Sequence, residues 1–302
     1  MFHDAHDHGF GFSPNLLQAI VAYPERQTDV PPWQGHVAFA RWLVATVRPR
    51  QIVELGVHKG DSLCAFCEAA IWFGTETRVH GVDLWQGDEH AGRYGDEVYE
   101  DLSAYFQARY GHFGTLHRTT FDAAASLFDD GSIDLLHIDG LHTYEAVAND
   151  FAKWLPKLSD RGVVLLHDIA ETERDFGVWR FWDELSRDYA TFRMDHSHGL
   201  GMAVVGSRPP KPVASLANAD AATQRSVANV FERLGTAVAA GPDQRQLRAE
   251  IVTLRDQNAR QQRTHDELAQ HMEKLRFDSA TYRAEVAEVQ AWAHQEVAEV
   301  QA

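Results

Sequence analysis

Short apolar runs alternate with amphipathic stretches along the first two thirds of the chain, and this alternation predicts the fold. Each apolar run is bounded by turn residues or acids, which is typical of strands buried in a parallel sheet. We predict strands at 51–55, 78–83 and 115–118 and two more ending at Asp139 and Asp168, with helices at 35–47, 62–73, 96–110, 144–155 and 178–189. Strands that alternate with helices indicate an α/β fold. The last two expected strands, 191–194 and 201–205, have no helix between them, so we expect an antiparallel hairpin edge.

The pattern changes after residue 207. Residues 208–212 are proline-rich and are predicted as a linker, and 216–239 has the spacing of one amphipathic helix. After the break at Gly241 and Pro242, residues 243–302 carry apolar positions seven apart with several polar members. This heptad indicates a coiled coil, with a single solvated helix as the alternative. The expected organisation is therefore an irregular segment 1–33, a domain 34–207, a linker and helix 208–242, and a coiled coil 243–302 that makes a homo-oligomer.

Composition excludes several classes of protein. The formal net charge of −16 disfavours binding to nucleic acid or anionic membranes over the general surface. No apolar run is long enough to span a membrane, and the N-terminus shows no signal-peptide pattern. The two cysteines, Cys64 and Cys67, fall inside a predicted helix, where buried thiols are favoured over redox or metal chemistry. We therefore expect a cytoplasmic protein.

Two apolar runs end in a histidine and an acid, His137 with Asp139 and His167 with Asp168. Ligands of parallel sheets bind beyond the carboxyl ends of the strands, so both runs deliver these groups to one rim. Two carboxylates there suit an oxygen-preferring ion such as Mg²⁺, although each could instead orient backbone. His142 follows Asp139 by three residues, and its imidazole is a candidate base for a hydroxyl. A hydrogen bond at a helix start is the alternative role for His142.

A second constellation lies between the first strand and its helix. Glu54 is followed by Gly56 and Gly60, a spacing that lets the backbone approach a ligand at a helix N-terminus. It matches neither a phosphate-binding loop nor the dinucleotide fingerprint. Asp83 ends the next strand, where an acid can accept ribose hydroxyls. Acids at both positions favour a nucleoside that carries positive charge, whereas the glycines alone would suit a tight structural turn.

Three segments resemble class I S-adenosylmethionine-dependent methyltransferases: residues 53–62 (VELGVHKGDS), 81–88 (GVDLWQGD) and 137–144 (HIDGLHTY). They are most similar to the branch that contains macrolide sugar O-methyltransferases and cephalosporin hydroxylase-like proteins. The resemblance covers about residues 35–206. It implies a seven-stranded, mostly parallel Rossmann-like sheet with an antiparallel last strand, and S-adenosylmethionine as the cofactor.

The cofactor-binding candidates come from the first two motifs and from the stretch after the third strand: Glu54, Gly56, Gly60, Ser62, Asp83, Trp85 and Asp122. The resemblance implies that the first three hold the amino-acid end of the cofactor. It also implies that Asp83 binds the ribose and that Asp122 or its neighbours lie near the adenine. Trp85, in the loop after Asp83, is a candidate for stacking in the pocket.

Some members of this branch bind a divalent metal through acids after the fourth and fifth strands, and Asp139 and Asp168 match those positions. Those members often have a second acid where this chain has His167. We predict catalytic roles for His142, Asp139 and His167 and metal-binding roles for Asp139 and Asp168. Without a metal, His142 would act as an unaided base.

The sequence thus predicts an O-methyltransferase that acts on a hydroxyl of a sugar or glycan, with partners in glycan synthesis. A methyltransferase for small natural products is one alternative. A non-catalytic coiled-coil assembly protein with a cofactor-binding head is the other.

Overall fold

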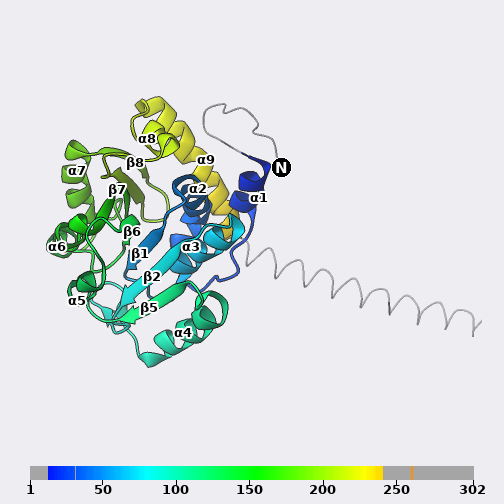
Figure 1. Cartoon of the computed structure of the whole chain (residues 1–302), viewed down its shortest axis with the longest axis vertical. Coiled ribbons are helices and arrows are strands. Elements are labelled where there is room, and N and C mark those ends of the chain that lie inside the picture. The colour runs from blue at the N-terminus through cyan, green and yellow to red at the C-terminus, as the bar shows by residue number, and fades with distance from the viewer. Residues whose placement is uncertain (1–12, 31, 241–259, 261–302) are drawn as a thin grey trace, which may run out of the picture. The chain divides into compact units, whose positions relative to one another are not determined.

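A computed structural model gives the structure of the chain and describes residues 13–30, 32–240 and 260. By its internal contacts the chain divides into two units, Met1–Gly241 and Pro242–Ala302. The first unit is an α/β fold (Figure 1). The predicted coiled coil at 243–302 lies outside the described residues, apart from residue 260.

The first unit is built on a seven-stranded sheet with the order β5-β2-β1-β6-β7-β9-β8. Its strands are β1 (Gln51–Leu55), β2 (Arg78–Asp83), β5 (Gly114–Arg118), β6 (Ile133–Ile138), β7 (Leu158–His167), β8 (Ala190–Met194) and β9 (Leu200–Val204). The first five in spatial order are parallel, and β9 runs antiparallel to both of its neighbours. The predicted mostly parallel sheet with an antiparallel last strand is confirmed.

Helices cover both faces of this sheet (Figure 1). The α-helices are α1 (Pro14–Val21), α2 (Val37–Val47), α3 (Asp61–Trp72), α4 (Asp96–Tyr110), α5 (Phe121–Ala124), α6 (Tyr144–Trp154), α7 (Val178–Asp188), α8 (Lys211–Ala217) and α9 (Ala221–Ala239), and short 3₁₀ turns lie at Pro32–His36, Ala125–Leu127 and Leu155–Lys157. Successive strand residues alternate between two hydrophobic clusters, one with α2 and α3 and the other with α6 and α7. The central strands therefore carry apolar side chains on both sides, which explains why apolar residues follow one another along them.

The segments on either side of the predicted domain are part of its core. Leu16 in α1 and Phe231 in α9 are buried in the same cluster as α2, and the ring of Phe231 meets Phe39 edge-on at 5.1 Å. A Cβ on Gly235 would overlap the carbonyl oxygen of Gly35, so α9 touches the 3₁₀ turn backbone to backbone. The prediction that the domain spans only 34–207 is therefore wrong.

The region 208–242 also differs from its predicted form of a linker followed by one helix. Lys211 already begins α8, and the single helix expected over 216–239 is two helices. Asp220 explains the division, because its side chain accepts hydrogen bonds from the backbone N–H groups of Ala222 and Thr223 and caps α9.

Residues 87–95 contain a small two-stranded sheet made of β3 (Gly87–Asp88) and β4 (Gly92–Arg93). This hairpin stands beside the carboxyl ends of the main strands. Within the part of the chain that the structure describes, none of the helices has the length and apolarity needed to cross a membrane.

Candidate functional site

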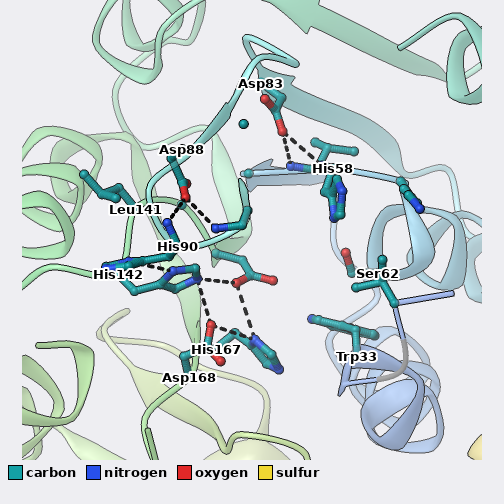
Figure 2. A pocket seen from close by; sticks show the side chains of 18 of the residues that line it. Trp33, His58, Ser62, Asp83, Asp88, His90, Leu141, His142, His167 and Asp168 are labelled. Atoms are coloured by element: carbon teal, nitrogen blue, oxygen red, sulfur yellow. Dashed lines mark hydrogen bonds and ion pairs between the residues drawn. The ribbon is translucent and has the colours of Figure 1, made fainter. Parts of the chain in front are cut away.

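A cavity of about 660 Å³ lies beyond the carboxyl ends of β1, β2, β6 and β7. Its size falls within the ~300–1,000 Å³ typical of small-molecule and cofactor sites. Figure 2 shows Ser62 and Asp83 on one side of it and His142 and Asp168 on the other. The two constellations expected from the sequence therefore face one cavity. Asp29, Val30, Pro32 and Trp33 add a wall from the N-terminal segment, which was not expected.

The turn after β1 has the shape that its glycines permit. Gly56 has a φ of 87° and Gly60 a φ of 82°, a left-handed conformation that side chains rarely adopt. A Cβ on Gly56 would also overlap the backbone carbonyl of Asp139, because the turn passes directly over the end of β6. The glycines thus serve the fold and bring the backbone to the cavity at the N-terminus of α3.

Asp83 lines the cavity and also holds the turn after β1. Its Oδ2 accepts hydrogen bonds from the backbone N–H groups of Val57 and His58, both at 2.9 Å, and its Oδ1 accepts from the N–H of Trp85 at 2.6 Å. A carboxylate offers about four lone-pair sites. Three are occupied, so Asp83 has capacity for one ribose hydroxyl rather than for two.

Glu54 lies beneath the cavity and does not line it. Its carboxylate is fully buried, accepts a hydrogen bond from the Ser62 hydroxyl and lies 3.4 Å from Nδ1 of His137. Burial raises the pKa of Glu54, against the lowering effect of His137. The indole N–H of Trp33 donates to Nε2 of His137 at 3.2 Å. Glu54 therefore acts on the cavity through Ser62 and Trp33, which do line it.

Two predicted cofactor residues lie outside the cavity. The indole of Trp85 is 1% exposed and packs in the core against Tyr99, with its N–H donated to the His58 carbonyl. Asp122 points toward α6, where it pairs with Lys153 at 3.4 Å. The structure therefore places neither of these two side chains in the cavity. The neighbouring Phe121 does line the cavity.

The carboxylates after β6 and β7 meet two histidines. Nε2 of His142 lies 2.8 Å from Oδ2 of Asp168 and 3.6 Å from Oδ1 of Asp139. Nδ1 of His167 lies 3.2 Å from Asp168 and 3.4 Å from Asp139. The ligand atoms of Asp139, His142 and Asp168 all lie within 4.8 Å of one another. The predicted catalytic and metal-binding residues are therefore one cluster.

Each member of this cluster shifts the pKa of the others. Burial alone would lower the pKa of His142, but the two carboxylates outweigh it and raise the pKa to about 9. The same carboxylates raise the pKa of the buried His167 well above its usual value. Despite their own burial, Asp139 and Asp168 have lowered pKa values because the histidines stabilise their charge. At neutral pH two carboxylates thus face two imidazolium rings, and the cluster is electrically balanced.

The backbone is held in uncommon conformations around the cavity. Asp168 has a φ of 62°, which aims its carboxylate at His142 rather than along the strand. Three other cavity residues without the freedom of glycine also have a positive φ: His58, Arg174 and His198. Such conformations persist where the surrounding structure imposes them, and they gather at functional sites.

Several cavity residues were not predicted from the sequence. His90 in the β3–β4 hairpin reaches Asp175 and Phe176 in the segment after β7. His198 lines the cavity and pairs with Glu171 at 2.6 Å. No motif marked these positions, because their partners are distant in sequence and only the fold brings them together.

Comparisons with known proteins agree with this geometry. A family model described as a methyltransferase domain matches residues 53–169. The uncharacterized protein y4gI of Sinorhizobium fredii is 43% identical over 211 residues, which are 70% of this chain and 23% of that protein. The chain thus spans about a quarter of the length of this curated relative.

Solved structures of similar fold include the cofactor-bound Rv0187 from MTB, with 16% identity, a TM-score of 0.45, and coverage of 66% of this chain and 92% of that one. Another is the O-methyltransferase TomG from Streptomyces achromogenes, involved in tomaymycin synthesis and solved with S-adenosylmethionine. It shows 15% identity, a TM-score of 0.44, and coverage of 65% and 91%.

The family match begins at Val53 in β1, just before the glycine turn, and ends at Ile169, just after the second carboxylate of the cluster. It therefore takes in both sides of the cavity. Over residues 53–169 the chain is therefore similar to methyltransferase domains.

Proposed function

We propose that this protein transfers a methyl group from S-adenosylmethionine to a hydroxyl of a sugar or glycan. One observation carries the proposal: a single cavity joins a glycine turn suited to the cofactor with a cluster of carboxylates and imidazoles suited to a hydroxyl. Methyl transfer needs both reactants in one water-poor space, with the acceptor oxygen in line with the sulfonium methyl.

In the cofactor half, the backbone of the turn from Gly56 to Gly60 lies beside the amino-acid end of the cofactor, with Ser62 next to it. Asp83 accepts one ribose hydroxyl, and Phe121 provides an apolar surface for the adenine. Carboxylates around the cavity favour the positive charge of the sulfonium. The residues present therefore fit this cofactor.

In the acceptor half, Asp139, Asp168 and His142 fit a divalent cation such as Mg²⁺. Their ligand atoms converge within 4.8 Å, and two carboxylates suit an oxygen-preferring ion. A cation bound there would hold vicinal hydroxyls and lower the pKa of the one that is methylated. The two carboxylates and His142 position it, and His167 fixes both carboxylates from behind.

The charge state of His142 argues against the unaided base. With a pKa of about 9, its imidazole already carries a proton at neutral pH and cannot take another from the acceptor. His167 is in the same position, because its pKa is raised by the same carboxylates. Both rings would become neutral only if another positive charge replaced their protons beside Asp139 and Asp168, and this favours the cation.

The acceptor side of the cavity carries several polar side chains. Asp88, Glu171, Arg174 and His198 line it, with Phe176 as an aromatic surface. Polar groups around one aromatic ring suit a polyhydroxylated acceptor better than a flat phenolic one. A small natural product that bears a sugar could contact the same lining residues, and it is the second candidate for the acceptor.

The test is calorimetric titration with S-adenosylmethionine, followed by transfer of a labelled methyl group to a panel of glycans, sugar-bearing natural products and phenols. We expect binding and label on a sugar hydroxyl. Label on phenols alone would refute the acceptor class, and binding without any transfer would favour a non-catalytic head. Absence of cofactor binding would refute the proposal as a whole. The variant Asp139→Asn should bind cofactor but transfer little.

A further inference from the structure

The β3–β4 hairpin and the segment after β7 meet at His90. The hairpin turn is fixed by Asp88, whose Oδ1 accepts hydrogen bonds from the N–H groups of His90 and Ala91, both at 2.7 Å. Although the hairpin lies at the surface, the side chain of His90 is only 3% exposed. The turn therefore directs this imidazole inward, toward the cavity (Figure 2).

His90 connects an exposed carboxylate to the acceptor side of the cavity. Its Nε2 lies 2.6 Å from Oδ1 of Asp175, and its Nδ1 lies 3.3 Å from Nδ1 of His142. Phe176 fixes the planes of both rings, with its centroid 4.5 Å from His90 and 4.8 Å from His142. The ring of His142 is nearly parallel to that of Phe176, at an angle of 4°. Four side chains thus define one geometry.

Hydrogen-bonding capacity assigns the protons along this chain. The Asp175 carboxylate can only accept, so Nε2 of His90 carries a hydrogen. In a neutral His90 the other nitrogen, Nδ1, is then an acceptor. Nδ1 of His142 must therefore donate to it. This leaves Nε2 of His142, the atom 2.8 Å from Asp168, as the ring nitrogen that faces the carboxylates.

We propose that His90, oriented by Asp175, is a positioning residue that keeps Nδ1 of His142 protonated and directs its Nε2 lone pair toward a cation held by Asp139 and Asp168. The inference rests on the proposed function, because the cation belongs to that proposal. Metal-binding histidines commonly donate their second N–H to a partner that fixes the ring. Here the partner is a histidine, and it comes from a hairpin distant in sequence.

A purely structural role would predict something different. If His90 only packed against Phe176, any flat ring at position 90 would serve, and the carboxylate of Asp175 would be dispensable. Asp175 is 65% exposed, so its replacement leaves no buried gap. Variants at these two positions therefore separate hydrogen bonding from packing.

The first measurement is the tautomer of His90 in the full chain, from the ¹⁵N shifts of labelled histidine near pH 7.5. We expect the hydrogen of His90 on Nε2, and loss of that preference in Asp175→Ala. The conservative Asp175→Asn keeps an acceptor oxygen and should restore it. A His90 with its hydrogen on Nδ1 alone would overturn the proposal.

The second measurement is the affinity of the full chain for Mn²⁺ by calorimetry, without substrate. His90→Phe keeps a ring against Phe176 but removes both nitrogens, and it should weaken binding by about 10- to 100-fold. Asp175→Ala should weaken it less, and Asp175→Asn should stay close to wild type. The matched controls His112→Phe, at an exposed ring, and Asp195→Asn, in an exposed ion pair, should change nothing.

The two measurements distinguish the ways of failing. Unchanged Mn²⁺ affinity in both His90→Phe and Asp175→Ala would refute the positioning role while leaving the proposed function intact. A wild-type chain that binds no divalent cation would refute both the cation site and this role toward it. If His90→Phe does not fold, the exposed Asp175→Ala decides the question alone.

Discussion

Binding of a divalent cation should release protons, and its strength should depend on pH in a defined direction. The cluster holds two carboxylates that are ionised at neutral pH and two histidines whose pKa values they raise. A cation that binds Asp139, Asp168 and His142 needs a neutral imidazole, because metal ligands must be deprotonated. The proton on His142 must therefore leave when the cation enters.

The cost of that proton can be estimated. At pH 7 the medium is two pH units below the pKa of about 9 for His142, so deprotonation costs about 2.7 kcal/mol. The apparent cation affinity should then rise about tenfold per pH unit from pH 7 and level off near pH 9. The acids do not reverse this trend, since their pKa values are lowered and they stay ionised throughout.

The assay is calorimetric titration with Mg²⁺ at pH 7.0, 7.75 and 8.5, each in two buffers of different ionisation enthalpy. We expect at least one proton released per cation at pH 7, and a second if His167 also becomes neutral. The control His142→Gln offers an oxygen ligand without a proton, so its proton release should fall by one. Equal affinity at all three values, with the same heat in both buffers, would show that the cation does not compete with the His142 proton.

Three further outcomes follow from the same structure. Asp83→Asn should weaken S-adenosylmethionine binding by tenfold or more in calorimetry and should also lower the melting temperature. The reason is that hydrogen bonds to a charged group contribute about 1.5–3 kcal/mol each. An unchanged affinity for S-adenosylmethionine would show that Asp83 is not part of the cofactor site. Gly56→Ala should abolish cofactor binding and should also destabilise the fold, because a Cβ there would overlap the carbonyl oxygen of Asp139. The control Gly131→Ala, with a φ of 72° and open space around it, should cost only ~1–2 kcal/mol in denaturant unfolding. Equal costs of the two variants in denaturant unfolding would refute the close approach at Gly56. A chain ending at residue 207 should be largely unfolded by circular dichroism, because burial of one large aromatic side chain such as Phe231 is worth about 3–5 kcal/mol. A chain ending at residue 241 should melt like the full chain but show a smaller oligomer by light scattering. A well-folded chain ending at residue 207 would refute the role of α8 and α9 in stabilising the fold.

The sheet could be predicted because its determinants are local. The central strands β1, β6 and β7 are buried on both faces over most of their length, and their apolar side chains alternate between two hydrophobic clusters. The order of strands and helices then follows from the sequence, including the antiparallel last strand. The rim residues Asp139, His142 and Asp168 follow from the same logic, because the end of a parallel strand always faces the same edge.

The boundaries of the folded unit could not be predicted in this way. Residues 208–212 have the composition of a linker, yet Arg208 already bonds to the carbonyl of Asp160 and the helices that follow are buried against α2. What holds them is long-range packing, such as Phe231 against Phe39 and Gly235 against Gly35. Proline content indicates how stiff a segment is, but it does not show whether the segment packs against residues that are distant in sequence.

The contrast between local sequence signals and long-range packing also applies to the site. The predicted acids of the site have local signals, whereas the residues that orient its side chains do not. Asp139 and Asp168 are placed by strand ends, and a sequence shows where a strand ends. His90 is placed by a two-residue pairing in a hairpin, and its partner Asp175 stands on another loop, so neither carries a local signal. Trp85 shows the opposite error, because its position beside a motif suggested a pocket and its backbone φ of 51° turns it into the core. The tautomer of His142 depends on the direction in which neighbouring side chains point. It can therefore be inferred only from a structure that contains the loops on both sides of the cavity.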